Sequence, residues 1–189
     1  MRIVAGAWRG RTLSAPPGTT TRPTADRVRQ ALFDRLLHAP WGGRDTVQGA
    51  RVLDVYAGTG AFGLEALSRG AANATFVEHD RAALVALRAN ITACRAQDRC
   101  TVLPIAALAI PPGEPADLVF LDPPYHHDLV MRASAHLRRQ GRLAPNALLI
   151  AETARDEPLP LSALLAERVH GAARISIWRA SPELFGLDQ

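Results

Sequence analysis

The sequence predicts an α/β fold with a doubly wound, mostly parallel sheet. From residue 50 onward, short apolar runs typical of buried strands alternate with longer runs of helical periodicity, and this alternation favours a parallel sheet with helices on both faces. A glycine-rich turn joins the first strand directly to a helix within residues 51–69. Two short runs at residues 167–171 and 173–179 indicate a terminal antiparallel hairpin.

The apolar runs place the individual elements. Strands are expected at residues 51–55, 74–78, 100–104, 117–121 and 147–152. Helices are expected at residues 61–69, 80–95 and 127–140. Together with the terminal hairpin, these runs make a sheet of seven strands.

An arm precedes the alternating region. Residues 2–13 contain apolar side chains interrupted by two glycines, which indicates a bent hairpin or an irregular strand pair. A helix capped by Thr24 or Asp26 follows, with apolar side chains at three- and four-residue spacing. Residues 40–49 have the composition of a linker. We therefore divide the chain into an N-terminal hairpin-and-helix arm, residues 1–49, and a main domain, residues 50–189.

The turn Ala-Gly-Thr-Gly at residues 57–60 indicates a cofactor site. Taken literally, Gly58 to Gly63 matches the G-x-G-x-x-G dinucleotide fingerprint. However, Asp54 ends the preceding strand, and a carboxylate there would repel a pyrophosphate. The same carboxylate suits the sulfonium and amino groups of S-adenosylmethionine, while turn N–H groups suit its carboxylate. We therefore expect S-adenosylmethionine to be held by Asp54, Ala57, Gly58, Thr59 and Gly60.

A second acid, Glu78, ends the next apolar strand. A carboxylate in this position accepts hydrogen bonds from both hydroxyls of a cofactor ribose. NAD would need the same acid. Asp54, rather than Glu78, therefore favours S-adenosylmethionine over NAD.

The sequence Asp122-Pro123-Pro124-Tyr125 carries the chemistry. It follows an apolar strand, so it lies at the same sheet edge as the glycine turn and Glu78. The two prolines stiffen the loop and remove two N–H donors. Asp122 and the Pro123 carbonyl are acceptors for an exocyclic amino group of a base, and Tyr125 offers a flat face on which an extruded base can stack. These four residues are our candidate catalytic residues.

The basic charge is concentrated near the N-terminus. All 22 basic residues are arginine, and the formal net charge is +4. Residues 1–40 hold seven arginines and two acids, whereas the rest of the chain holds 15 arginines and 16 acids. Clustered guanidinium groups favour a phosphate backbone, although a solvated face in an arginine-rich protein is the alternative. The candidate nucleic-acid-binding residues are therefore Arg2, Arg9, Arg11, Arg22 and Arg29, together with Trp8, whose ring can stack on a base.

Other features exclude several classes of protein. No apolar run approaches the ~20 residues that span a membrane, and the N-terminus has no signal-peptide pattern. The two cysteines, Cys94 and Cys100, lack metal-binding spacing, so we expect reduced thiols and no metal site. These observations favour a cytoplasmic protein without a membrane partner.

The combined motifs resemble a known family. D-x-x-A-G-T-G at residues 54–60 with D-P-P-Y at residues 122–125 resembles the class I amino methyltransferases that act on adenine N6 or guanine N2. R-I-V-A-G-A-W-R-G-R-T-L at residues 2–13 and R-P-T-A-D-R-V-R-Q-A-L-F at residues 22–33 are similar to the RsmD-type family, and the similarity covers nearly the whole chain. The resemblance implies a Rossmann-like sheet with a reversed last strand.

The resemblance also implies an activity: methylation of guanine N2 in small-subunit ribosomal RNA with S-adenosylmethionine. The substrate would be ribosomal RNA in the small subunit or in an assembly intermediate, and the protein would act as a monomer. Two positions depart from the family pattern. Ala106 stands where an Asn or Asp usually meets the cofactor adenine, and Gln30 stands where a Glu usually follows the helix arginine.

Three alternatives remain open from the residues alone. An adenine-N6 methyltransferase on DNA or RNA uses the same D-P-P-Y motif. An NAD-dependent oxidoreductase fits the glycine fingerprint, although Asp54 opposes it. A non-enzymatic RNA-binding assembly factor fits if Ala106 marks a decayed cofactor site. Binding of S-adenosylmethionine separates the two methyltransferases from the other two.

Overall fold

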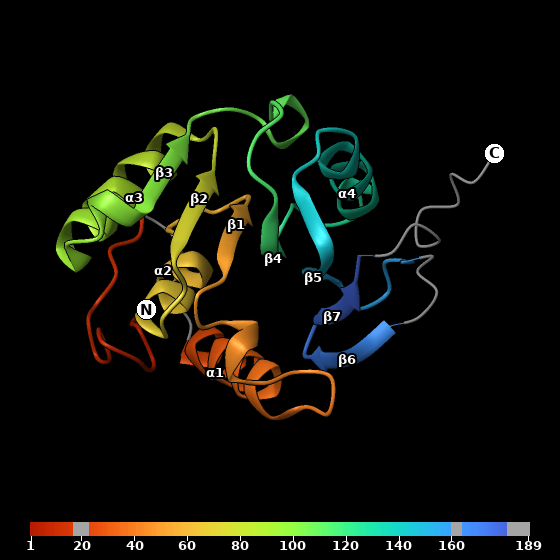
Figure 1. The fold of residues 1–189 in the computed structure, drawn as a ribbon, viewed down its shortest axis with the longest axis horizontal. Helices are drawn as coiled ribbons and strands as arrows, with labels where there is room; N and C mark the ends of the chain where they lie inside the picture. Colours follow the sequence, from red (N-terminus) through yellow and green to blue (C-terminus); the bar gives the residue numbers. More distant parts are fainter. Residues whose placement is uncertain (17–22, 160–163, 181–189) are drawn as a thin grey trace.

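A computed structural model of the chain describes residues 1–16, 23–159 and 164–180 (Figure 1). These residues form a seven-stranded sheet in the order β3-β2-β1-β4-β5-β7-β6. The strands are β1 Arg51–Val55, β2 Asn73–Val77, β3 Cys100–Leu103, β4 Ala116–Leu121, β5 Leu143–Ala154, β6 Leu164–His170 and β7 Ala173–Arg179. The five strands from β1 through β5 run parallel to one another, and β7 runs antiparallel to both β5 and β6. The predicted doubly wound, mostly parallel sheet with a terminal antiparallel hairpin is confirmed.

Four α-helices and three short 3-10 turns accompany the described strands. The helices are α1 Pro23–His38, α2 Ala61–Ser68, α3 Arg81–Cys94 and α4 Leu129–Arg139. The 3-10 turns are η1 Arg44–Thr46, η2 Gln97–Arg99 and η3 Ala107–Ala109. The expected main-domain helices agree with α2, α3 and α4 to within two residues at each end. The 3-10 turns are too short to leave a periodic signal in the sequence.

The helices cover both faces of the sheet. Alternate residues of each strand point to opposite faces, so each strand contributes side chains to both layers. Val52 and Phe120 belong to a buried cluster with side chains of α1, α2 and α3. Leu53 and Val119 belong to a second buried cluster with side chains of α4 and η3. The strands are therefore apolar on both faces, as a doubly covered parallel sheet requires. In the described part of the chain, no helix has both the length and the apolar character needed to cross a bilayer.

The largest boundary difference concerns β5. It begins at Leu143, four residues earlier than expected, and its pairing with β4 is irregular between Ala116 and Leu118. Pro145 and Asn146 interrupt the apolar run there, and Asn146 has a positive φ of 64°. A prediction based on uninterrupted apolar residues therefore places the start of this strand too late.

The N-terminal segment packs directly on the sheet layer. Its only described strand pairing is a single antiparallel bridge between Arg2 and Thr12, so it is a bent hairpin-like loop. Ile3 is fully buried in the cluster that also contains Phe33 of α1 and Leu64 of α2. The arm and the main domain thus share one apolar core, and the division at residue 49 stays a prediction.

Candidate active site

Strand register brings the predicted site residues to one edge of the sheet. Val55 of β1 pairs with Val77 of β2 and with Leu121 of β4. Leu121 in turn pairs with Ala151 of β5. The next residues are Glu78 after β2, Asp122 after β4 and Glu152 within β5, so these three carboxylates lie at the same edge of the sheet. This edge adjoins the switch between β1 and β4, where ligands bind in open α/β sheets.

The glycine turn joins β1 to α2 with left-handed backbone. Gly60 is the N-cap of α2 with φ 78°, and a Cβ there would collide with Leu87 of α3. Gly58 has φ 54°, but no heavy atom lies within 4 Å of the position its Cβ would take. Gly60 is therefore required by packing, whereas Gly58 leaves open space beside the backbone for a ligand.

Asp54 supports this turn from beneath. Its side chain is 1% exposed, and its Oδ2 accepts a hydrogen bond of 2.9 Å from the Gly63 N–H in the first turn of α2. Burial raises the pKa of Asp54 from 3.8 to about 7, the Gly63 bond opposes this rise, and Glu78 adds to it. The carboxylate therefore holds the start of α2 and places a titratable charge behind the turn.

Glu78 orders the loop between β2 and α3. Its Oε1 accepts from the backbone N–H groups of His79 and Asp80, both at 2.7 Å. Its Oε2 accepts from the Gly58 N–H at 2.9 Å, which ties this loop to the glycine turn. Asp80 then caps α3 by accepting from the Ala83 N–H at 2.8 Å.

A cavity of about 470 Å³ opens beside these acids. The described residues lining it are Tyr56, Glu78, His79, Asp80, Asp122, Pro123, Pro124 and Tyr125. It therefore joins the predicted ribose acid to the complete D-P-P-Y motif. Ala106 is exposed ahead of η3 and is not among these lining residues. Its predicted role beside the cofactor adenine stays a prediction.

A second cavity of about 420 Å³ also reaches the motif. It shares Tyr56, Asp122 and Tyr125 with the first cavity. Its other walls come from the glycine turn, α1, β5 and the β6–β7 hairpin: Met1, Val28, Arg29, Ala57, Gly58, Thr59, Ala61, Phe62, Glu152, His170, Ala172, Ala173 and Ile175. Two ligands held in the two cavities would therefore meet at Asp122.

Asp122 is the carboxylate between the two cavities. Its side chain reaches solvent through them, but the surrounding protein removes much of its hydration, and this desolvation raises the pKa of Asp122. The nearby carboxylates of Glu152 and Asp54 raise that pKa further. Asp122 is therefore a stronger base than a carboxylate in open water.

Tyr125 stands beside Asp122 with its ring edge toward His126. Its hydroxyl donates a hydrogen bond of 2.8 Å to Oε1 of Glu152. Desolvation and this bond to Glu152 raise the pKa of the Tyr125 hydroxyl, so it remains a neutral donor. The bond fixes the ring against β5, where it forms part of both cavity walls.

Sequence reasoning missed two residues at this site. Glu152 is the sole acid in the β5 run Ala147–Ala154, and a charged residue within a buried apolar strand is the signal that could have identified it. Tyr56 lies between β1 and the glycine turn with φ 62°, which is rare for a bulky residue and is a feature of strained sites. Its hydroxyl is buried and has no hydrogen-bond partner in the described part of the chain.

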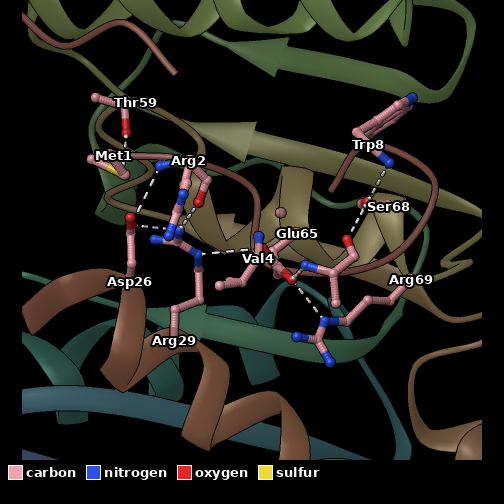
Figure 2. Close-up of polar contacts among 12 residues, drawn as sticks. Met1, Arg2, Val4, Trp8, Asp26, Arg29, Thr59, Glu65, Ser68 and Arg69 are labelled. Atoms are coloured by element: carbon pink, nitrogen blue, oxygen red, sulfur yellow. Dashed lines mark hydrogen bonds and ion pairs between the residues drawn. The ribbon is translucent and has the colours of Figure 1, made fainter. Parts of the chain in front are cut away.

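Buried polar side chains anchor the N-terminal segment to α2, as Figure 2 shows. Glu65 is fully buried, and its carboxylate accepts from the backbone N–H groups of Val4 (2.8 Å) and Ala5 (3.0 Å). Ser68 Oγ accepts from the Trp8 N–H at 2.9 Å and donates to the Ala5 carbonyl at 2.6 Å. Two successive turns of α2 therefore hold the loop.

The same segment is tied to the glycine turn. Thr59 Oγ1 lies 3.7 Å from Met1 Sδ, within reach of a weak hydrogen bond. The Asn90 side-chain amide donates to the carbonyls of Ser14 and Thr59, both at 3.0 Å. The start of the chain, the turn and α3 thus form one hydrogen-bonded unit.

The predicted RNA-binding residues occupy different environments. Arg2, Arg9 and Arg11 are exposed, and an Arg11 guanidinium nitrogen donates to the Ala93 carbonyl. Trp8 is partly buried, with the guanidinium of Arg99 5.1 Å from its ring centre. Arg22 lies outside the described residues. An RNA-contact role for these five residues stays a prediction.

Arg29 differs from the others because it is only 2% exposed. Its guanidinium pairs with Asp26 at 2.9 Å, lies 3.5 Å from Glu65, and donates to the Arg2 carbonyl (Figure 2). Its contacts therefore hold α1 against the N-terminal segment, and little of its side chain is available to a phosphate.

No group of three or more potential metal ligands occurs in residues 1–16, 23–159 and 164–180. Cys94 and Cys100 are free thiols, and burial raises the pKa of each, that of Cys100 to about 12. The predicted absence of a metal site stays a prediction.

The combination of this sheet with a glycine turn and a D-P-P-Y loop at its carboxyl edge is that of the class I methyltransferases.

Comparisons with known proteins identify the family. The model of the family described as "Conserved hypothetical protein 95" matches residues 1–178, and the chain belongs to this family. A curated relative, ribosomal RNA small subunit methyltransferase D of Escherichia coli (strain K12), is 40% identical over 161 residues, which cover 85% of this chain and 78% of that protein. The proposed RsmD-type membership is thereby confirmed.

Solved structures agree with the fold. The putative methyltransferase yhhF from Escherichia coli superposes with a TM-score of 0.83 at 37% identity, covering 97% of this chain and 99% of that chain. The 16S rRNA N2 guanine methyltransferase RsmC of Thermus thermophilus, solved with AdoMet and guanosine, has a TM-score of 0.68 at 20% identity. That likeness covers 87% of this chain and 45% of the other, and it concerns the fold alone.

Proposed function

We propose that the protein transfers the methyl group of S-adenosylmethionine to the exocyclic N2 amino group of a guanine in small-subunit ribosomal RNA. The observation that carries the proposal is the position of Asp122 and Tyr125 between two cavities. The first cavity also contains Glu78, and the second has room for a base beside the same acceptor. Membership of the family with ribosomal RNA methyltransferase relatives supports RNA as the substrate.

The residues present fit S-adenosylmethionine. Glu78 at the wall of the first cavity would hold the ribose hydroxyls. Gly58 lines the second cavity, and its open side leaves room for the amino-acid end of the ligand beside the turn. Asp54 places negative charge behind the turn, which favours a cationic ligand. The bound cofactor supplies an electrophilic methyl group on its sulfonium.

Asp122 and the Pro123 carbonyl would act on the target amine. When they accept its two N–H hydrogens, the nitrogen lone pair leaves conjugation with the ring and can form the new N–C bond. The methyl–sulfur bond breaks as this bond forms, and its electron pair stays on sulfur. The nitrogen, now cationic, then releases a proton to Asp122, whose raised pKa suits it to this role.

The finer parts of the proposal rest on the sequence. The substrate is ribosomal RNA within the small subunit or an assembly intermediate. The protein acts as a cytoplasmic monomer without a metal ion. Tyr125 stacks on the target base, which reaches the second cavity after leaving its stack.

The test is methyl transfer from labelled S-adenosylmethionine to small-subunit RNA, followed by mass spectrometry of the nucleosides. N2-methylguanosine is expected with the wild type. Asp122→Asn should lower the rate about a hundred- to a thousandfold, as for loss of one preorganised group in a transition state. Calorimetry should show that Asp122→Asn keeps affinity for S-adenosylhomocysteine. Formation of N6-methyladenosine, or absence of transfer to RNA, would overturn the proposal.

A further inference from the structure

A groove of about 230 Å³ is lined by residues of α1, β6 and β7, next to the active site. Leu32, Ile175 and Ile177 form its floor and are each at most 6% exposed. Arg35 of α1 and Arg168 of β6 stand on its opposite rims and are exposed. We call this feature the α1–β6 groove.

The α1–β6 groove continues from the second cavity. Val28, His170 and Ile175 line both spaces. The second cavity contains Asp122 and Tyr125, which we assign to the target base. A polymer whose base occupies that cavity therefore has a direct path along the groove.

The charge on the rims favours an anion. In the described ranges, neither Arg35 nor Arg168 forms an ion pair with a carboxylate. The acid at the groove, Glu167, faces Arg174 at 3.8 Å, so its charge is partly offset. Two guanidinium groups on either side of an apolar floor match a nucleotide, which has a flat base and a charged phosphate.

We propose that the α1–β6 groove binds the nucleotide next to the target guanine in the RNA strand, an inference that rests on the function proposed above. The base of that nucleotide lies on the apolar floor, and Arg35 and Arg168 hold the adjoining phosphates. Because the floor offers no polar side chain, the groove contacts the face of the base and not its edge. It therefore tolerates any base but requires that one be present.

The charge on the rims is tested by the double variant Arg35→Gln/Arg168→Gln. Filter binding of an RNA fragment across a salt series should show a slope of log affinity against log salt that is smaller by roughly 1.4–1.8, at 0.7–0.9 per phosphate contact. The matched control is Arg88→Gln/Arg139→Gln, which removes two exposed arginines from α3 and α4. The slopes of the control and the wild type should agree.

The apolar floor is tested by filling it. Ala31→Leu adds side-chain volume in the groove on a helix that tolerates leucine, and it should weaken RNA binding roughly tenfold. Gln30→Leu adds an apolar side chain at the neighbouring exposed position and should leave binding unchanged. An RNA with an abasic site beside the target should bind the wild type about tenfold more weakly than intact RNA does. The Ala31→Leu variant should bind the abasic RNA and the intact RNA equally well.

The outcomes separate this inference from the proposed function. If the wild type methylates guanine in RNA but all groove variants match it in slope and affinity, the groove assignment is wrong and the function stands. If the wild type transfers no methyl group to RNA, the function is wrong regardless of the groove. Self-association that Ala31→Leu abolishes, seen by sedimentation at unchanged RNA affinity, would assign the groove to a second copy and overturn the inference.

Discussion

The Tyr125 hydroxyl donates a hydrogen bond of 2.8 Å to Oε1 of Glu152, joining the loop after β4 to the end of β5. This bond separates two possible contributions of Tyr125: the ring for stacking and the hydroxyl for holding the loop. Each contribution can be removed on its own.

Tyr125→Phe keeps the ring and removes the hydrogen bond. We expect kcat/KM on RNA to fall less than about tenfold, since one partly exposed hydrogen bond contributes about 1 kcal/mol. Tyr125→Ala removes the stacking face and should cost roughly ten- to a hundredfold, mainly through KM for RNA. Steady-state kinetics on one RNA fragment measure both. If the two variants are equally impaired, the ring is not the main contribution of Tyr125.

Glu152 should set the acid limit of activity through Asp122. Because Glu152 raises the pKa of Asp122, the acid limb of the pH profile should lie above the range of an ordinary carboxylate. Glu152→Gln keeps an acceptor for Tyr125 but removes the charge, so the pKa of Asp122 should fall and the limb should move to lower pH. The pH dependence of kcat/KM for wild type and variant tests this. An unshifted limb would show that Asp122 is not the titrating group.

Asp54 should make the ligand-free protein less stable at neutral pH. Its pKa is raised from 3.8 to about 7, so the folded state binds a proton more tightly than the unfolded state. That stabilisation is complete below about pH 4 and is lost as the pH rises through 7, at about 1.4 kcal/mol for each pKa unit. Asp54→Asn should remove this dependence and be more stable at pH 8, by about 4 kcal/mol at most.

Chemical denaturation between pH 4 and pH 8 measures the effect, with Asp117→Asn as the comparison. The pKa of Asp117 is lowered by its pairing with Arg51, so its contribution to stability changes only below about pH 4, and Asp117→Asn should keep the pH dependence of the wild type between pH 4 and pH 8. Asp54→Asn should also bind S-adenosylhomocysteine more weakly, because the negative charge behind the turn is gone. Equal pH dependence of stability in wild type and Asp54→Asn would contradict the assignment.

Glu65 forms contacts with residues that are too distant in the sequence for a local pattern to predict. Its location on a helix after the glycine turn was predicted, because strand, turn and helix are local signals. Its partners Val4 and Arg29 are 61 and 36 positions away along the chain. A count of charged residues does not distinguish exposed arginines from buried ones, so the burial of Arg29 could not be predicted from the sequence. The position of Glu152 beside Asp122 likewise depends on the β4–β5 register, which no local pattern encodes.

Removing the charge of Glu65 should destabilise the protein. Glu65→Gln leaves the buried guanidinium groups of Arg29 and Arg69 without their shared carboxylate, a change that costs about 3 kcal/mol or more. Denaturant unfolding should show this loss, and proteolysis should cleave the N-terminal segment sooner. The exposed acid Glu114, changed to Gln, is the control and should change stability by less than about 0.5 kcal/mol.

The N-terminal loop provides the remaining test of RNA contact, through Arg9 and Arg11. Both are exposed on a loop that Glu65 and Ser68 hold in place, so their replacement by Ala should leave the fold intact. The slope of log RNA affinity against log salt should fall by roughly 1.4–1.8. Cofactor affinity should be unchanged, since neither residue lines the cavity beside Glu78. Raising the RNA concentration should restore turnover, because the loss is in binding. An unchanged slope, with the α1–β6 groove variants reducing theirs, would place the RNA along α1 and β6 and away from the loop.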